Sequence, residues 1–449
     1  MILSRILPAS AAALGLALAL VVLSAPARAQ VAITDVTSPG GITAWLVEEP
    51  SIPFVAMDIR FTGGAALDPD GQKGVTSLMV SLLGEGAADR DARAFAKATE
   101  ELATGFGYSL SDDTITVTAR FLSENRDDAL ALLRDSLVAP RFDPEAIERV
   151  RAQTLASLRS DARNPRRIAG KAFDAKVFGD HPYGQPRDGT EASVTALTRA
   201  DIAAAHRGAL TRDGLHLGVV GDITADELGP LLDALFADLP ETGWPAPGPV
   251  AATFDGTVTT VDFPTPQSVL LFGQPGIDRD HPDFFAAFVL NTVLGASGFE
   301  SRLMRELRER RGLTYGVTTY LANRDQADLL QGMVATSNDR VPETLDVLRA
   351  EWARLARDGI TEEELTNAQT YLTGAYPLRF DGNARIAAIL AGMQRDGMPI
   401  DYVNTRNAMI EAVTLQDVNR VAAGLLDPSA LSFVIVGQPE GIEPPAAGN

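Results

Sequence analysis

The sequence predicts an α+β fold made of two related halves, each a mainly antiparallel sheet packed with helices. Three observations lead to this class. In each half, strand-like alternating stretches come first, longer helical stretches follow, and one buried strand closes the unit. The same order of strands, helices and capping signals occurs twice along the chain. At 449 residues, the chain is also too long for one hydrophobic core.

The first half opens with antiparallel strands, because its alternating apolar runs are interrupted by Pro-Gly-Gly and Glu-Pro-Ser. Pro144 suits the first turn of a long helix. Thr198 and Asp201 form the capping signal of a later helix. In chain order, we expect strands within residues 31–64, helices over 74–83 and 91–105, strands over 108–122, helices over 124–138 and from 144, a loop over 181–190, the capped helix, and a buried strand over 215–222.

The second half repeats these signals. Thr414 again has an aspartate three positions later, and it corresponds to Thr198 of the first half. Another helix is expected to begin at Glu362, which corresponds to Pro144. The two pairs are separated by nearly the same number of residues. Matches in the same order at nearly one offset indicate an internal duplication. The expected elements are strands over 257–276, a helix over 281–295, a helix and strand over 301–321, a strand over 328–337, helices over 341–359 and 360–376, the capped helix, and a closing strand over 431–438.

These patterns divide the chain into five parts. They are a signal peptide at 1–29, an N-terminal domain over 30–237, a linker over 238–252, a C-terminal domain over 253–438 and a flexible tail over 439–449.

The stretch at 1–29 combines Arg5, an apolar run and the small-residue cleavage signal Ala27-Arg28-Ala29, which predicts a cleaved secretory signal peptide and a periplasmic protein. The alternative is an uncleaved membrane anchor, since the run approaches the length of a spanning helix. Cleavage would remove two arginines and no acid, taking the net charge from −20 to −22. This charge argues against nucleic-acid binding, and we expect no membrane association after cleavage. The absence of cysteine excludes disulfides and thiolate metal sites.

One segment, at positions 301–317, combines a charged helix with a glycine stop and a strand. Arg308 has no acid three or four positions away, whereas Glu306 can pair with Arg302 and Arg310, and Glu309 with Arg305. Gly312 is a suitable helix end.

The alternation that follows places Tyr315 on the same face as the apolar Leu313 and Val317. Two interpretations remain open. The segment is an ordinary corner with a surface arginine and a core tyrosine, or Arg308 and Tyr315 share a functional site.

Two α+β halves, an HPYG loop at 181–184 and RERRGLTYG at 308–316 resemble the pitrilysin/insulinase family of zinc metallopeptidases, which includes mitochondrial processing peptidase. The resemblance covers nearly all of the mature chain. It implies two metallopeptidase-like halves that close as a clam shell around a chamber. It also implies an H-x-x-E-H motif in the first half, in which two histidines bind zinc and the glutamate is the general base.

That motif is absent here. The family's segment falls on positions 74–86, where Ser77 and Ser81 occupy the ligand positions and Val80 the base position, and the distal glutamate falls near Ser157. Serine hydroxyls are poor zinc ligands, and valine cannot accept a proton. None of the four histidines has a second histidine or a glutamate at helical spacing, and His181 in the HPYG loop is expected to have a structural role. We therefore expect no metal in this chain, and zinc in a partner subunit.

In the family, an arginine and a tyrosine seven positions apart in the second half hold the peptide and stabilise the oxyanion, and Arg308 and Tyr315 have this spacing. A guanidinium and a phenol are suitable donors to a developing oxyanion. The resemblance thus implies the non-catalytic subunit of a periplasmic heterodimer that cleaves peptides only with an H-x-x-E-H partner. The alternative is an inactive structural or peptide-binding scaffold, for example a homodimer. A stand-alone protease of unrelated chemistry is a third interpretation.

Overall fold

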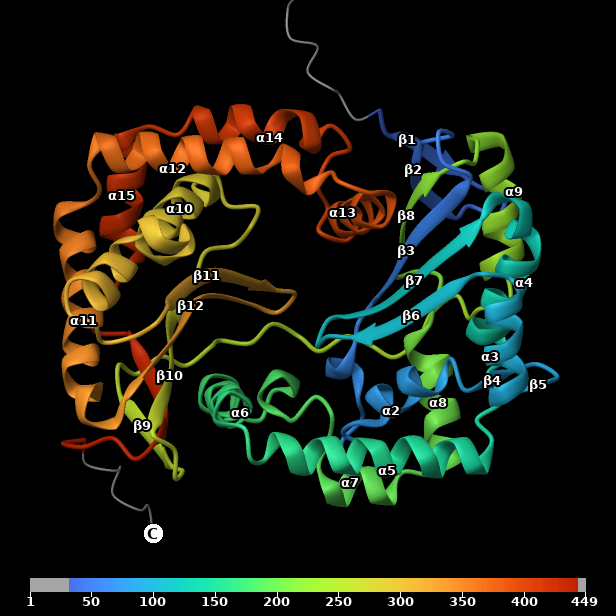
Figure 1. Cartoon of the computed structure of the whole chain (residues 1–449), viewed down its shortest axis with the longest axis horizontal. Helices are drawn as coiled ribbons and strands as arrows, with labels where there is room; N and C mark the ends of the chain where they lie inside the picture. Colours follow the sequence, from blue (N-terminus) through green and yellow to red (C-terminus); the bar gives the residue numbers. More distant parts are fainter. Residues whose placement is uncertain (1–31, 443–449) are drawn as a thin grey trace, which may run out of the picture.

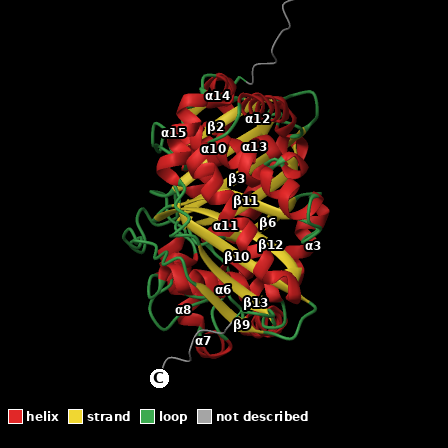
Figure 2. Cartoon of the chain, turned by 90° about the vertical axis from the view of Figure 1, so that its left-hand side faces the viewer, coloured by secondary structure: helices red, strands yellow, loops and turns green. Residues whose placement is uncertain are grey.

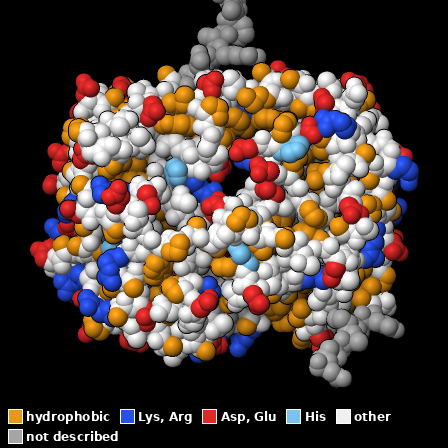
Figure 3. All heavy atoms as spheres, turned by 180° about the vertical axis from the view of Figure 1, so that it is seen from behind, with side chains coloured by type: hydrophobic (Ala, Val, Ile, Leu, Met, Phe, Trp, Pro, Cys, Tyr) orange, Lys and Arg blue, Asp and Glu red, His pale blue; other side chains and the backbone are white. Residues whose placement is uncertain are grey.

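The computed structural model describes residues 32–442. The expected signal peptide at 1–29 lies outside the described residues, as does 443–449 of the expected tail. Figure 1 shows the two halves side by side, with the N-terminal half on the right. From behind, the surface is hollowed near its centre, with acidic side chains beside the hollow (Figure 3). Within the described part, no helix combines the length and apolar character needed to cross a membrane.

Within residues 32–442, the two large sheets share the same order of five strands, and the N-terminal sheet has β1 as an additional edge strand. The N-terminal sheet has the order β1-β2-β8-β3-β7-β6, and the C-terminal sheet, read from its other edge, has the order β9-β13-β10-β12-β11. In each, the closing strand is parallel to one neighbour, β8 to β2 and β13 to β9, and the remaining pairs are antiparallel. The predicted α+β class and the duplicated, mainly antiparallel halves are confirmed. The strands are β1 Thr34–Thr37, β2 Thr43–Glu48, β3 Phe54–Thr62, β6 Gly105–Leu110, β7 Thr114–Leu122, β8 Leu215–Gly221, β9 Val258–Asp262, β10 Gln267–Pro275, β11 Val317–Arg324, β12 Ala327–Ser337 and β13 Ser432–Gly437, and a small pair is formed by β4 Gly86–Ala87 and β5 Arg90–Asp91.

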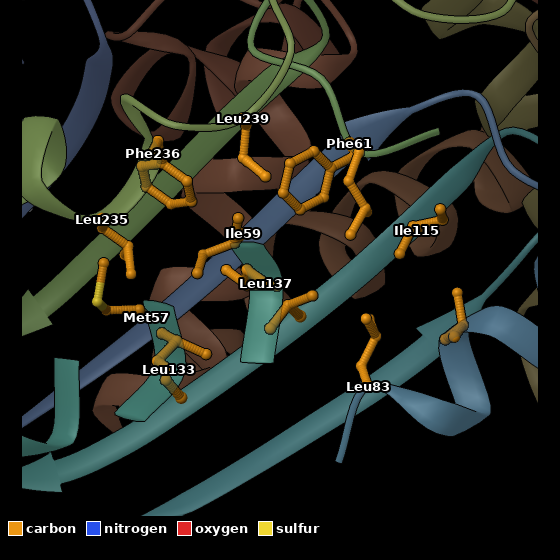
Figure 4. Packing of buried hydrophobic residues seen from close by; sticks show 14 of the residues in the cluster. Met57, Ile59, Phe61, Leu83, Ile115, Leu133, Leu137, Leu235, Phe236 and Leu239 are labelled. Carbon is orange, nitrogen blue, oxygen red and sulfur yellow. The ribbon is translucent and has the colours of Figure 1, made fainter. Parts of the chain in front are cut away.

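Helices lie on the outer side of both sheets (Figure 1), and Figure 2 shows those of the C-terminal half in front of the strands. The N-terminal core is formed where apolar residues of β3 contact the helices behind it, as the residues labelled in Figure 4 show. The helices of the N-terminal half are α2 Val75–Leu82, α3 Ala92–Glu101, α4 Arg126–Val138, α5 Pro144–Asp161, α6 Pro165–Phe178, α7 Glu191–Ala196, α8 Arg199–Ala209 and α9 Ala225–Phe236. Those of the C-terminal half are α10 Phe284–Asn291, α11 Val341–Asp358, α12 Glu362–Ala375, α13 Asn383–Arg395, α14 Tyr402–Glu411 and α15 Leu415–Leu425, with π-helical segments η4 Thr292–Ala296 and η6 Met304–Glu309.

Two helices pack against the sheet of the other half. From α6, Phe173 and Val177 contact the inner face of β10 and β13 in the C-terminal sheet. From α13, Leu390 and Met393 contact Trp45 of β2 and its neighbours in the N-terminal sheet. The exchange joins the halves through two apolar interfaces.

The inner hairpin tips of the two sheets also meet (Figure 1). Arg324 at the end of β11 places Nη2 3.0 Å from Oδ1 of Asp174 in α6. The next residue, Asp325, donates its backbone N–H to Asp113 at 3.4 Å, at the turn between β6 and β7. The centre of the molecule is therefore a polar contact between the halves.

The sequence-based expectations omitted several helices, namely α6, α7, α9, α13 and α14. The omission of α6 and α13 matters most, because these two helices connect the halves. Their first residues, Pro165 and Asn383, have the same separation along the chain as Pro144 and Glu362, so the duplication includes them. Alanine- and glycine-rich helices with charged residues on the solvent side show weak apolar periodicity, which explains why the pattern does not predict them.

Candidate functional site

The segment that carries Arg308 and Tyr315 is a wide helical turn followed by a tight chain reversal. In η6, the N–H of Arg310 donates to the carbonyl of Arg305 at 3.0 Å, an i→i+5 bond that defines a π-helix. The N–H of Gly312 then donates to the carbonyl of Arg308 at 3.0 Å, and Gly312 has a φ of 62°, as a left-handed helix end requires. The predicted stop at Gly312 is confirmed.

The residues around Tyr315 are tied to strand β12. The Thr314 hydroxyl donates to the carbonyl of Ala335 at 2.7 Å, and the carbonyl of Leu313 accepts a hydrogen bond from Thr336 at 2.6 Å. Leu313 and Thr314 are buried, but Tyr315 is 85% exposed. The turn therefore holds the backbone in place and points the phenol away from the core.

The expectation that Tyr315 shares a face with Leu313 and Val317 was wrong. Strand β11 begins at Val317, two positions after the tyrosine, so strand alternation does not apply at Tyr315. The hydroxyl of Thr314 also accepts from the N–H of Gly316 at 3.1 Å, which turns the chain before the strand starts. The interpretation of Tyr315 as a core residue is thereby excluded.

A buried carboxylate organises the arginines of the turn. Glu306 is 5% exposed and accepts from Arg310 at 2.6 Å and from Arg311 at 2.5 Å. Burial alone would raise the pKa of Glu306, but the hydrogen bond from Arg311 and the charges of Arg310, Arg311 and Arg354 outweigh burial, and the pKa is lowered. Arg308 lies partly exposed on the same turn.

The expected pairs of Arg302 with Glu306 and of Arg305 with Glu309 are not formed. Both arginines instead bind Glu364 of α12, Arg302 at 2.5 Å and Arg305 at 3.1 Å. Burial opposes ionisation of Glu364, yet the hydrogen bonds from Arg302 and from the Thr361 backbone lower its pKa to about 2. The π-turn changes the spacing of side chains around the axis, so pairs expected for an α-helix are replaced by contacts with a neighbouring helix.

Tyr315 stands at a pocket of about 430 Å³ between the two halves. The C-terminal half contributes the turn itself and apolar side chains of β10, β11 and β12, including Val269 and Met333. The N-terminal half contributes Arg166, from the first turn of α6. Ser77, Val80, Ser81 and Ser157 are not among the residues that line this pocket, so within one chain the tyrosine and the former metal positions are not brought together.

The former metal positions carry ordinary structural contacts. The Ser77 hydroxyl donates to Asp188 at 2.9 Å, and the Ser81 hydroxyl donates to the carbonyl of Ser77 at 2.9 Å. Val80 is 3% exposed and belongs to the N-terminal core, whereas Ser157 is exposed on α5. Among residues 32–442, no group of three or more His, Cys, Asp or Glu side chains could hold a metal ion. The residues at these positions do not fit zinc.

Sequence reasoning missed Arg166 and Asp188. The duplication contains a signal for Arg166. The first residues of α6 and α13, Pro165 and Asn383, have the same separation as Pro144 and Glu362, which indicates a helix start at Pro165, just before Arg166. Asp188 follows the HPYG loop, and only the folded chain brings it to Ser77.

Comparison with known proteins agrees with the fold. Residues 44–191 match the insulinase domain of peptidase family M16, and residues 196–372 match the peptidase M16 inactive domain. The chain belongs to the M16 peptidase family.

Among its relatives, the chain is similar to a protein of Helicobacter pylori called non-peptidase homolog YmxG, with 26% identity over 87% of this chain and 90% of that protein. An uncharacterized zinc protease of Mycobacterium leprae is also 26% identical, over 87% of this chain and 88% of the relative. The crystal structure of a peptidase M16 inactive domain from Pseudomonas fluorescens matches with a TM-score of 0.85 and 27% identity, covering 92% of this chain and 99% of that one. The relatives thus include proteins named as proteases and proteins named as inactive.

Proposed function

We propose that this protein is the non-catalytic subunit of a heterodimeric periplasmic metallopeptidase. A homologous partner would contribute the H-x-x-E-H motif and zinc, and this chain would contribute Arg308 and Tyr315. Peptides or unfolded segments that fit the chamber would be the substrates. The single observation that carries the proposal is Tyr315, a large side chain that is 85% exposed although the two residues before it are buried and bonded to β12.

The chemistry assigned to this chain is hydrogen-bond donation. The phenol of Tyr315 and the guanidinium of Arg308 would donate to the carbonyl oxygen of the scissile peptide, and these bonds would strengthen as negative charge develops on the oxygen. The backbone of this turn is held by hydrogen bonds to β12, so the donors need little rearrangement when negative charge develops on the carbonyl oxygen. Serine and valine at the former metal positions provide neither zinc ligands nor the base of the family's motif, so this role requires a second chain.

The test is reconstitution with an H-x-x-E-H homologue from the same organism. We expect the two chains to copurify, zinc to be found in the partner, and peptide cleavage to require the mixture. Zinc bound to this chain alone, or cleavage of peptides by this chain alone, would contradict the proposal.

An inactive scaffold, such as a homodimer, is the second candidate. It is favoured by the name of the Helicobacter pylori relative, which calls that protein a non-peptidase homologue. The two candidates differ in the native complex. A stable homodimer that gains no activity with any H-x-x-E-H homologue would support the scaffold, whereas a mixed dimer with turnover would support the subunit.

A further inference from the structure

The pocket beside Tyr315 combines an apolar floor with one positive charge. Its floor is the inner face of the C-terminal sheet, which is apolar at Val269, Met333 and Ala335. Its polar groups are Gln267, Thr318 and residues of the Tyr315 turn. Arg166 is the only charged residue in its lining, in a chain with a net charge of −20.

The pocket exists because α6 covers only part of this sheet face. From Ile168 and Ala169 onward, the helix packs on β10 and β13 and buries them. The helix begins at Pro165, so its first turn reaches the edge of the covered area and the floor beyond it stays accessible. Met333 and Ala335 are accordingly partly exposed, although they lie within the central part of β12.

Arg166 is available to a ligand at this edge. Its side chain is exposed, and among the described residues no carboxylate lies within ion-pair distance of it. The next residue, Arg167, has its Nε 3.7 Å from Asp161 and does not line this pocket. A guanidinium beside apolar walls binds a carboxylate through paired hydrogen bonds, and the surrounding low-polarity surface strengthens them.

We infer that this pocket is a peptide subsite that binds a carboxylate flanked by apolar side chains, with Arg166 as its recognition residue. The inference rests on the proposed entry of peptides into the chamber, and it specifies their chemistry. The volume of about 430 Å³ is at the lower end of the range of about 300–1,000 Å³ usual for ligand pockets, which suits a short segment. The carboxylate is either the C-terminus of the peptide or an Asp or Glu side chain.

Fluorescence anisotropy on the whole chain, without a partner, tests the inference. The probes are three labelled apolar hexapeptides: one with a free C-terminal carboxylate, one with a C-terminal amide, and one amide with a single internal aspartate. We expect at least one carboxylate peptide to bind about tenfold more tightly than the plain amide, and its identity shows the source of the carboxylate. Added salt should reduce the difference, because the contact is partly open to solvent.

The variant Arg166→Gln should abolish that difference, and Arg163→Gln is the matched control. Arg163 is exposed in the turn before α6 and does not line the pocket, and its replacement by glutamine removes the same charge. Three results would overturn the inference: equal binding of all three probes, equal losses in both variants, or no binding of any probe at about 1 mM. The assay measures neither turnover nor assembly, so its failure would leave the subunit role to be judged by reconstitution.

Discussion

At the scale of single residues, the site depends on an exposed tyrosine that follows two buried residues, Leu313 and Thr314. Tyr315 lies between Thr314, which is buried and bonded to β12, and the start of β11 at Val317. An aromatic side chain left in solvent gains no packing energy within the chain, and its exposure leaves the phenol of Tyr315 accessible to a partner or a substrate. Arg308, on the preceding turn, is partly exposed.

The first prediction concerns these two donors. Tyr315→Phe or Arg308→Ala should lower the turnover of the reconstituted pair by about 10²-fold or more, since each removes a donor to the developing oxyanion. Peptide hydrolysis under saturating substrate is the measurement. Tyr371→Phe is a control, because Tyr371 is a half-exposed tyrosine on α12 outside the Tyr315 pocket. Full activity in both test variants would contradict the role of Arg308 and Tyr315 as oxyanion donors.

At the scale of elements, the π-helical turn η6 determines how the side chains of this segment are oriented. Its i→i+5 geometry brings Arg311 next to Glu306, which α-helical spacing would not do as well. The buried carboxylate of Glu306 then contacts Arg310 and Arg311, which directly follow η6, and Arg354 of α11. A charged group so deeply placed is stable only because it is surrounded by donors.

The second prediction concerns this carboxylate. Glu306→Gln should lower the free energy of unfolding by about 1.5–3 kcal/mol, the range for hydrogen bonds to charged groups. Urea unfolding of the purified chain near neutral pH measures the change, with Glu309→Gln, an exposed acid on the same turn, as the control. The pKa of Glu306 is lowered in the folded state, so its contribution is present above its ordinary pKa and is lost as the pH falls. If the two variants were equally stable, Glu306 would not organise the turn.

At the scale of the whole molecule, the exchange of α6 and α13 joins the halves. Gln394 of α13 forms hydrogen bonds with both backbone groups of Leu217 in β8, accepting at 3.2 Å and donating at 2.5 Å. The approach is close because the next residue, Gly218, has no side chain. A Cβ there would lie 2.0 Å from the carbonyl oxygen of Ala387. Opening the chamber by separating the halves would therefore require these helices to leave their sheets or to move with them.

The third prediction tests this close packing. Gly218→Ala should lower the free energy of unfolding by about 1–3 kcal/mol, because the added methyl group meets the backbone of α13 and the helix must shift. Gly105→Ala is the matched control in a strand, since a Cβ at Gly105 meets nothing within 4 Å. The urea midpoints of both variants give the comparison, and similar midpoints would show that α13 is not held tightly on β8.

The fourth prediction concerns pH at the contact between the halves. Burial raises the pKa of Asp174 to about 6, with Asp112 acting in the same direction and Arg324 and Arg187 opposing it. Because the pKa is higher in the folded state than the ordinary 3.8, the group favours folding most at low pH, and this contribution is lost as the pH rises from about 4 through 6.

The stability of the wild-type chain relative to Asp174→Asn should therefore fall over that interval. Urea midpoints at pH 4.5 and pH 7 measure it. A difference that stays constant or grows with pH would contradict the assignment.

The sequence alone determines the duplication, the absence of the zinc motif and the end of the helical turn. Repeated capping signals at Thr198 and Thr414 reveal the duplication, because caps and closing strands depend on local residues. Ser77, Val80 and Ser81 exclude the zinc motif by residue type alone. Gly312 identifies the end of the turn, since a positive φ favours glycine.

The tertiary structure decided which surfaces those elements present and to which half. Only the hydrogen bonds from Thr314 and to Leu313 explain why Tyr315 points outward, because they join segments that are distant along the chain and override the alternation of the sequence. Only tertiary packing places α6 and α13 on the sheet of the opposite half, because the sequence of an apolar helix face does not specify which sheet it packs against. The pocket at Arg166 follows from that exchange, because its two walls come from different halves of the chain.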